Sequence, residues 1–356
     1  MKGPDMPMSS FSPRARAAVL AVLCMASPAA AQDPVEQFYR GKSINVYVGS
    51  SAGGGYDSYA RILSRYMSKY IPGNPLIVVQ NMPGAGSNKA AGYVYGVAPK
   101  DGTVIGAIFP GSILQPLIGD SAVQHDPAKF VYVGSANSDV YTCVVRTDAP
   151  AKTFKDVTTH ETIVGASNEG GTTRDMPTLS NNVLGAKFRV VTGYAGTQEI
   201  ALAVERNEVH GICGFGYTSL LTVRPDWVPN GTVRILVQEN AKGNAELNKM
   251  GVPRTVDFAK TAEDRQVMEL IYSQSIFGRP YVLPPGVPAD RAAALRQAFM
   301  TALQDKELLA EAARIKLDIE GISGEDVQAM VSKLFATPPN IIERAKQSLV
   351  YKPPAR

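Results

Sequence analysis

Short apolar runs rich in β-branched residues alternate with amphipathic stretches along most of the chain. The runs have the composition of buried strands, and the stretches between them repeat apolar residues at helical spacing. Strands are predicted over 44–48, 76–80, 104–109, 130–135, 141–146, 161–166, 188–192, 211–215 and 234–237. Helices are predicted over 56–70, 87–97, 174–184 and 198–206, and they predominate from 288 to 349. The alternation predicts an α/β protein with parallel sheets covered by helices on both faces.

The chain has 356 residues, enough for two domains with separate cores. No internal repeat or low-complexity linker divides it, so we expect two doubly wound α/β domains joined by extended strands that cross more than once. We predict domain I over 32–138 and 273–356, and domain II over 139–272. The crossing segments at 137–140 and 273–277 would form the hinge.

The first 31 residues have the pattern of a secretory signal peptide. Arg14 and Arg16 precede the apolar run 17–25, and the alanines at 29–31 supply a small-residue cleavage site. The run is too short to span a bilayer, and no later segment reaches that length. We therefore expect an exported protein that begins near Gln32 and does not insert into the membrane.

Charge and cysteine usage add two constraints. The formal net charge is +4, and removal of residues 1–31 lowers it to about +2, which gives no reason to expect nucleic acid as a partner. Export permits a disulfide between Cys143 and Cys213. Two separate buried cysteines are the equal alternative.

Four loops rich in glycine or hydroxyl residues follow predicted strands, at 50–57, 81–88, 167–174 and 192–197. The first leads into a helix, where backbone N–H groups and the helix dipole favour an anion. Ligands of open parallel sheets bind beyond the carboxyl ends of the strands. A glycine after one strand is often only a turn. Two such loops in each half, however, predict a ligand cleft between two α/β domains.

No residues with the spacing of a catalytic or metal site accompany these loops. The three histidines have no partner at ligand spacing, and neither a G-x-S-x-G nor an H-E-x-x-H motif occurs. The G-x-G runs at 53–55 and 84–86 lack the rest of a dinucleotide fingerprint. We predict no catalytic residue, no metal and no cofactor. An exported hydrolase on the same fold is the enzyme alternative.

Two charged residues of the loops have alternative roles. Asp57 lies in the first turn of its helix, where capping of backbone N–H groups is the simpler role and ligand contact the other. Arg174 begins a predicted helix, where the dipole disfavours a cation. An anionic ligand, or a salt bridge to Glu169 or Asp175, would account for it.

Several segments resemble the Bug (TctC-like) family, the periplasmic substrate-binding proteins of the tripartite tricarboxylate transporter system. The resemblance covers essentially residues 36 to 350, and its segments lie at 38–42, 52–57, 79–86, 98–103, 165–172, 193–196 and 283–288. The triple glycine at 53–55, paired with Asn-x-Pro-Gly-Ala-Gly at 81–86, is specific to that family.

The resemblance implies a periplasmic Venus-flytrap fold whose two domains close on a small carboxylate. In this family the ligand is held largely by loop N–H groups and ordered water, and the loaded protein docks on a two-component membrane permease driven by an ion gradient. We expect a monomer. Carried onto this chain, the resemblance implies ligand contacts from Ser51, Ala52, Gly53, Gly54, Gly55, Tyr56, Asp57, Ala85, Gly86, Ser87, Asn88, Ser167, Gly170, Gly171, Thr172, Thr173, Tyr194, Ala195 and Gly196.

Three departures from the family pattern leave the ligand open. Residues 50–52 stand where the family often has prolines, and Tyr56 replaces a common threonine. The segment 168–174 departs from a frequent G-x-G-S pattern, which makes Arg174 a further candidate for binding a carboxylate. A di- or tricarboxylate, an aromatic acid and a neutral solute all remain possible ligands. A sensor that presents its loaded form to a signalling partner is the alternative to transport.

Overall fold

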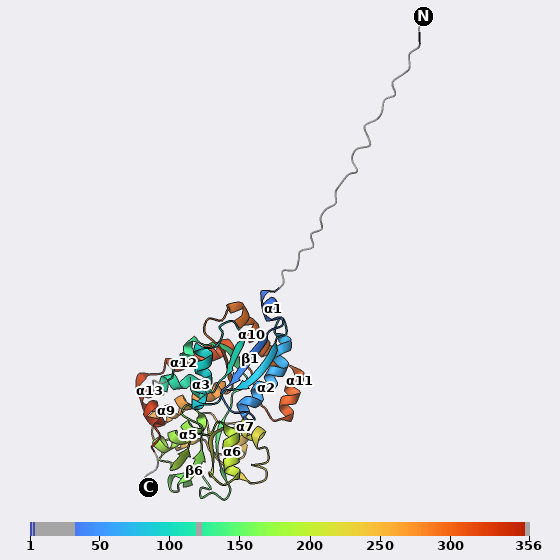
Figure 1. Cartoon of the computed structure of the whole chain (residues 1–356). Coiled ribbons are helices and arrows are strands. Elements are labelled where there is room, and N and C mark those ends of the chain that lie inside the picture. The colour runs from blue at the N-terminus through green and yellow to red at the C-terminus, as the bar shows by residue number, and fades with distance from the viewer. Residues whose placement is uncertain (2, 4–32, 119–122, 353–356) are drawn as a thin grey trace. The chain divides into compact units, whose positions relative to one another are not determined.

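The buried strands of the chain assemble into two sheets (Figure 1). The structure is a computed structural model that describes residues 1, 3, 33–118 and 123–352. Within these residues the first sheet has the strand order β11-β4-β10-β3-β1-β2, and the second has the order β7-β6-β8-β5-β9. The predicted signal peptide lies outside the described residues, apart from residues 1 and 3.

The first sheet is built from both ends of the described chain. Its strands are β1 (Ser43–Val48), β2 (Leu76–Asn81), β3 (Val104–Ala107), β4 (Val131–Ser135), β10 (Pro280–Leu283) and β11 (Ile322–Ser323). β1 pairs in parallel with β2 and β3, whereas β10 and β11 pair antiparallel with their neighbours.

The second sheet comes from the middle of the chain. Its strands are β5 (Tyr141–Arg146), β6 (Thr162–Gly165), β7 (Phe188–Val191), β8 (Gly211–Gly216) and β9 (Val233–Glu239). β6 runs parallel to β7 and β8, and β5 runs antiparallel to β8 and β9. The prediction of parallel sheets was thus wrong for the strands next to the chain crossings, because a strand that enters a sheet from the other half can run in either direction.

Helices follow the strands and cover the sheets. In the first half they are α1 (Pro34–Tyr39), α2 (Gly55–Met67), α3 (Asn88–Gly96) and α4 (Pro110–Ile118), and in the second α5 (Thr172–Leu179), α6 (Thr197–Glu205), α7 (Tyr217–Val223), α8 (Ala245–Lys249) and α9 (Ala262–Tyr272). The C-terminal part contributes α10 (Ala289–Ala302), α11 (Lys306–Arg314), α12 (Gly324–Phe335) and α13 (Pro339–Leu349). None of the described helices is long and apolar enough to cross a membrane.

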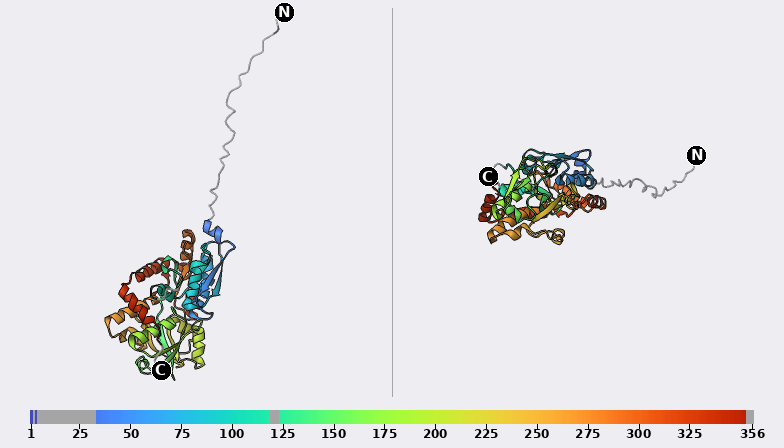
Figure 2. Two further views of the ribbon diagram at one scale, coloured as in Figure 1. Left: turned by 60° about the vertical axis from the view of Figure 1, so that its left-hand side comes forward. Right: turned by 90° about the horizontal axis from the view of Figure 1, so that it is seen from below.

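The described residues form three core clusters. Ile44 of β1 and Phe299 of α10 belong to a cluster of the first sheet, and Phe215 of β8 belongs to a cluster of the second sheet. The third cluster contains residues of both sheets, such as Val282 of β10 and Val164 of β6. The C-terminal helix α13 packs against α9 and also against α4 and α5 (Figures 1 and 2). It therefore contacts helices that follow strands of both sheets.

The chain crosses between the sheets twice in the described part, from β4 to β5 and from β9 to β10. The two crossing segments lie side by side. The Asp139 N–H donates to the Ser275 carbonyl at 3.0 Å, and the Gly278 N–H donates to the Asn137 carbonyl at 3.0 Å. These are the segments in which the sequence places the hinge.

Candidate ligand-binding site

A small enclosed space lies where loops and helix ends of the two sheets meet. We call it the Arg279 cavity; it holds about 30 Å³ of water-accessible volume. A second hollow of about 150 Å³, here the Gly86 hollow, shares Phe109 and Ser167 with it. Since one water needs roughly 10–15 Å³ of such volume, the Arg279 cavity as it stands accommodates only very small groups. A larger ligand requires the two halves to separate.

The helices α2, α5 and α6 begin at the Arg279 cavity. Gly55 and Tyr56 open α2, Thr172 and Thr173 open α5, and Thr197 opens α6; all five line the cavity. The first N–H groups of a helix have no intrahelical acceptor, and the helix dipole adds partial positive charge there. The convergence of three such helix ends from both halves favours a bound anion.

A buried arginine completes the cavity. The Arg279 side chain is 2% exposed and lies between β9 and β10 in the chain. Its Nη2 atom pairs with Asp139 Oδ2 at 2.8 Å and donates to Ser219 Oγ at 2.8 Å, while its Nε has no hydrogen-bond partner among the described residues. The guanidinium also lies 4.3 Å from the centre of the Tyr56 ring. Arg279 therefore joins a crossing segment, α2 and α7 at one point.

Aromatic rings form the remaining wall. The rings of Tyr56 and Phe109 are 4.4 Å apart between centroids. Burial raises the pKa of Tyr56 to about 12, and burial raises the pKa of Tyr141 well above its ordinary value. Both hydroxyls are therefore neutral at pH 7. The Tyr141 hydroxyl is buried and finds no acceptor or donor within the described residues, so it is available to a ligand.

The structure distributes the residues expected from the sequence over several places. Those on the Arg279 cavity are Gly55, Tyr56, Ser167, Thr172, Thr173 and Gly196. The Gly86 hollow takes Gly86, Ser87, Tyr194 and Ala195, again with Ser167. Ala85 and Asn88 line a separate, wider groove beside Gln115. Arg279 and Ser219 were not predicted, because no glycine loop or motif marks them; a lone arginine before the apolar run 280–283 was the available signal.

Ser51 and Gly54 of the first loop face α6 of the second half of the protein rather than the cavity. Ser51 Oγ donates to Glu199 Oε2 of α6 at 2.7 Å. A Cβ added to Gly54 would lie 3.2 Å from Thr197 Oγ1, also on α6. Ala52 and Gly53 are exposed. Ser51 and Gly54 therefore lie where the two halves meet.

Several loop glycines permit the two halves to approach closely. A Cβ on Gly111 of α4 would overlap the Gly170 carbonyl oxygen, and one on Gly55 would overlap the Ser219 hydroxyl. Gly86 likewise faces the backbone of 169–171, where Gly171 is the residue that precedes α5. Part of the glycine pattern thus reflects backbone contact between the halves.

The Asp57 carboxylate bonds to neighbouring groups of the protein, among them the backbone of the loop just before α2. Its carboxylate accepts the Gly53 N–H at 2.9 Å, an Asn81 amide N–H at 2.9 Å and the Arg61 Nε–H at 2.8 Å. Burial by itself raises the pKa of this carboxyl, but the hydrogen bonds from Arg61, Gly53 and Asn81 outweigh burial and hold the pKa below its usual range. The Asp57 carboxylate therefore has its hydrogen-bond partners within the protein and does not depend on a ligand for them.

Arg174 lies away from both the Arg279 cavity and the Gly86 hollow. Its Nη1 donates to the Leu349 carbonyl at 2.7 Å and pairs with Asp175 at 3.0 Å, and its Nη2 lies 3.6 Å from Glu169. Burial raises the pKa of Asp175 to about 6, although Arg174 opposes the shift. The salt-bridge alternative from the sequence is the arrangement that the structure contains.

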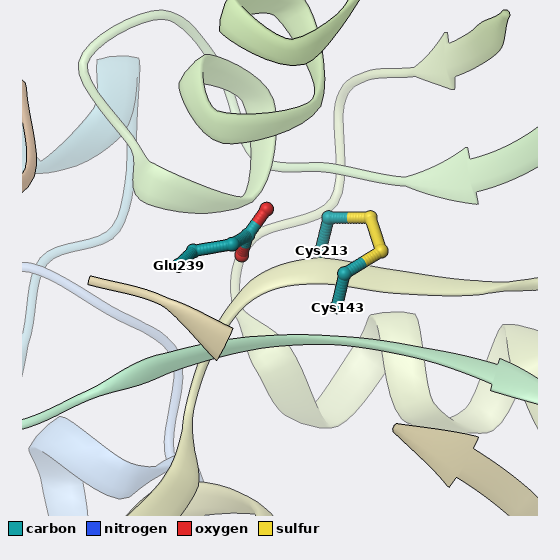
Figure 3. A group of neighbouring side chains, drawn as sticks. All are labelled: Cys143, Cys213 and Glu239. Atoms are coloured by element: carbon teal, nitrogen blue, oxygen red, sulfur yellow. A yellow bond between two sulfur atoms is a disulfide. The ribbon is translucent and has the colours of Figure 1, made fainter. Parts of the chain in front are cut away.

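A disulfide joins Cys143 of β5 to Cys213 of β8. Figure 3 shows the Glu239 side chain beside it. The two sulfurs and one carboxylate oxygen lie within 4.8 Å of one another. Because each sulfur is bonded to the other, these three residues do not offer a set of metal ligands.

Comparison with known proteins gives matches among solved structures only. No protein-family model and no curated protein matches the chain. The periplasmic binding protein BugD matches with a TM-score of 0.69 and 20% identity, over 87% of this chain and 98% of BugD. MatC (Rpa3494) from Rhodopseudomonas palustris, solved with bound malate, matches with a TM-score of 0.67 and 18% identity, over 86% of this chain and 99% of MatC.

A third solved structure, R. palustris Rpa4515 with adipate, has a TM-score of 0.67 and 19% identity, over 87% of this chain and 97% of that protein. At these identities the likeness concerns the fold. The prediction of the fold class is confirmed: the chain has the two-domain, Venus-flytrap α/β fold of periplasmic binding proteins such as BugD and the TctC-type proteins.

Proposed function

We propose that the protein is an extracytoplasmic solute-binding protein of the Bug (TctC-like) type, which captures a small carboxylate between its two halves. The observation that carries the proposal is the Arg279 cavity, where the N-termini of α2, α5 and α6 meet a buried arginine and an unpartnered tyrosine hydroxyl. Malate and adipate, the ligands of two proteins with the same fold, are dicarboxylates.

Binding rather than turnover is the expected activity, because the cavity holds hydroxyl groups and a neutralised arginine but no nucleophile–base pair in its lining. The predicted signal peptide supports a periplasmic location for the protein. Delivery to the permease of a tripartite tricarboxylate transporter, as a monomer, follows from the resemblance. Presentation to a sensor is the alternative that the cavity alone does not distinguish.

A thermal-shift screen of the ligand-free mature protein tests the proposal. The probes are malate, adipate and other small carboxylates, each paired with its neutral amide. A ligand at a hundred times its Kd stabilises the protein by about 2.7 kcal/mol, which raises the Tm by roughly 5 °C or more in a protein of this size. We expect shifts with carboxylates only. Shifts with the amides only, or none with any acid, would contradict a carboxylate site.

A further inference from the structure

A buried acid stands directly behind the wall of the Arg279 cavity. Glu239 ends β9, is 1% exposed and faces Tyr141 of β5 in the sheet register. Its Oε2 accepts the Gly214 N–H at 2.6 Å. Figure 3 shows its side chain next to the disulfide between β5 and β8.

Gly214 lies between the Glu239 carboxyl and the cavity. Gly214 itself lines the cavity, and its carbonyl accepts the Thr172 hydroxyl at 2.7 Å, at the start of α5. Its φ of 63° and the overlap that a Cβ would make with the Thr172 carbonyl require glycine here. One peptide group therefore separates the Glu239 carboxyl from the cavity.

Within the described part of the chain, Glu239 has no positively charged partner. The groups packed around it are Tyr141 and Cys143 of β5, Cys213 of β8 and Tyr272 of α9. The cysteines are bonded to each other, and burial raises the pKa of both tyrosines well above 10. On α5, Arg174 and Asp175 pair with each other. No cation of the described residues forms an ion pair with Glu239, and burial raises the pKa of its carboxyl to about 8 against the opposing Gly214 hydrogen bond.

The cavity has no net positive charge that could balance a second negative charge beside the ligand. Asp139 neutralises the charge of Arg279, since the two side chains form an ion pair at 2.8 Å and both are buried. A bound carboxylate adds one negative charge held by helix ends and neutral donors. An ionised Glu239 would add another across the Gly214 peptide, in a region of low dielectric constant where repulsion is strong.

We propose that Glu239 is a positioning residue that must carry a proton for the Arg279 cavity to hold an anionic ligand, so that carboxylate binding is coupled to retention of that proton. The inference rests on the proposed function. It adds a pH dependence set by a residue that does not touch the ligand.

Calorimetric titration with malate and with adipate tests the coupling. Wild type, Glu239→Gln and the control Glu208→Gln, an exposed acid before β8, are compared at pH 7 and 9, and at pH 8 in two buffers of different ionisation enthalpy. Wild type and the control should bind about fivefold or more weakly at pH 9 than at pH 7, and take up about half a proton per ligand at pH 8. Glu239→Gln should show neither effect.

The outcomes separate the two proposals. Binding of either acid to wild type without proton uptake, or an unchanged pH dependence in Glu239→Gln, overturns the role of Glu239 alone. Failure of wild type to bind either acid at any pH overturns the proposed function and this inference with it. If Glu239→Gln does not fold, the proton uptake of wild type at pH 8 is the test of the role of Glu239, and binding without uptake overturns it.

The pH dependence of the unfolding free energy tests the protonation of Glu239 without a ligand. The unfolded carboxyl releases its proton near pH 4.3, whereas folded Glu239 keeps it up to about pH 8. The folded state then binds more protons between these values, so the unfolding free energy of wild type should fall from pH 5 to pH 8 relative to Glu239→Gln. Parallel curves for the two proteins would contradict a protonated Glu239.

Discussion

The Arg279–Asp139 pair is the residue-level feature on which the site depends. Both side chains are almost fully buried, and Arg279 also contacts Ser219 and the ring of Tyr56. A buried ion pair adds little net stability, but removal of one partner leaves the other charge uncompensated. The pair therefore joins the two crossing segments. It also supplies the cavity with a guanidinium group whose positive charge is balanced by the Asp139 carboxylate.

We predict that Arg279→Met lowers the unfolding free energy by about 3–5 kcal/mol, because Asp139 is left buried and unpaired. The double variant Arg279→Met/Asp139→Asn should recover part of the loss. Arg40→Met is the control, since Arg40 pairs with Glu36 on the exposed surface and such pairs contribute about 0–1 kcal/mol. Urea unfolding measures all three; equal losses for Arg279→Met and Arg40→Met would contradict a buried structural pair.

Arg279 shows the limit of sequence reasoning at this scale. Loop glycines and hydroxyls predict a site because their local spacing carries the signal, and Gly55, Thr172 and Gly196 do lie at the cavity. The partners of Arg279 are Asp139 and Ser219, 140 and 60 positions away in the chain. Only the crossing of the chain brings them together.

At the scale of elements, strand–loop–helix units position the site. β1 leads into α2, β6 into α5 and β7 into α6, and each helix starts at the Arg279 cavity. These units were predictable because the strand, the glycine turn and the amphipathic helix are each visible in local sequence. α4, α7, α9 and β10 were not predicted, since their short apolar segments lack a clear period or a turn signal.

Substitution at the start of α2 tests the role of these helix ends. Gly54→Val should abolish detectable carboxylate binding and leave the fold intact. Gly54 has extended backbone angles that valine adopts, and the new side chain would press on Thr197 at the cavity. Gly92→Val on α3 is the control, because a Cβ there meets no atom within 4 Å. Undiminished affinity of Gly54→Val, measured by calorimetry, would contradict the assignment of the site.

A second prediction concerns Arg174 in the first turn of α5. Arg174→Ala should leave carboxylate affinity within about twofold of wild type, because the guanidinium binds Leu349 and Asp175 rather than the cavity. It should lower stability by about 3 kcal/mol, since Asp175 loses its partner. Calorimetry and urea unfolding separate the two effects. A large loss of affinity with unchanged stability would restore Arg174 as a ligand-binding residue.

At the scale of the whole molecule, ligand binding depends on the fit between the two halves. Contacts made by both halves to one ligand are complete only when the halves are together, so the ligand shifts the population toward the closed arrangement. The hydrogen bond from Ser51 to Glu199 and the close backbone approach of Gly111 to Gly170 belong to that arrangement.

Gly111→Ala tests closure without altering the cavity, which Gly111 does not line. The added methyl group would overlap the Gly170 carbonyl, so the variant should bind the carboxylate at least about tenfold more weakly. Small-angle scattering should show that saturating ligand compacts wild type and the control Gly96→Ala, whose Cβ meets no atom within 4 Å. Compaction of Gly111→Ala equal to that of wild type would argue against this contact as a requirement for closure.

The central claim is that the Arg279 cavity holds a carboxylate, and a crystal structure of the mature protein with the best-binding acid tests it most directly. We predict a carboxylate group at the first turns of α2 and α5, within hydrogen-bond distance of backbone N–H groups of Gly55–Tyr56 and Thr172–Thr173. A ligand bound outside the cavity, or inside it with no polar contact to either helix end, would contradict the account.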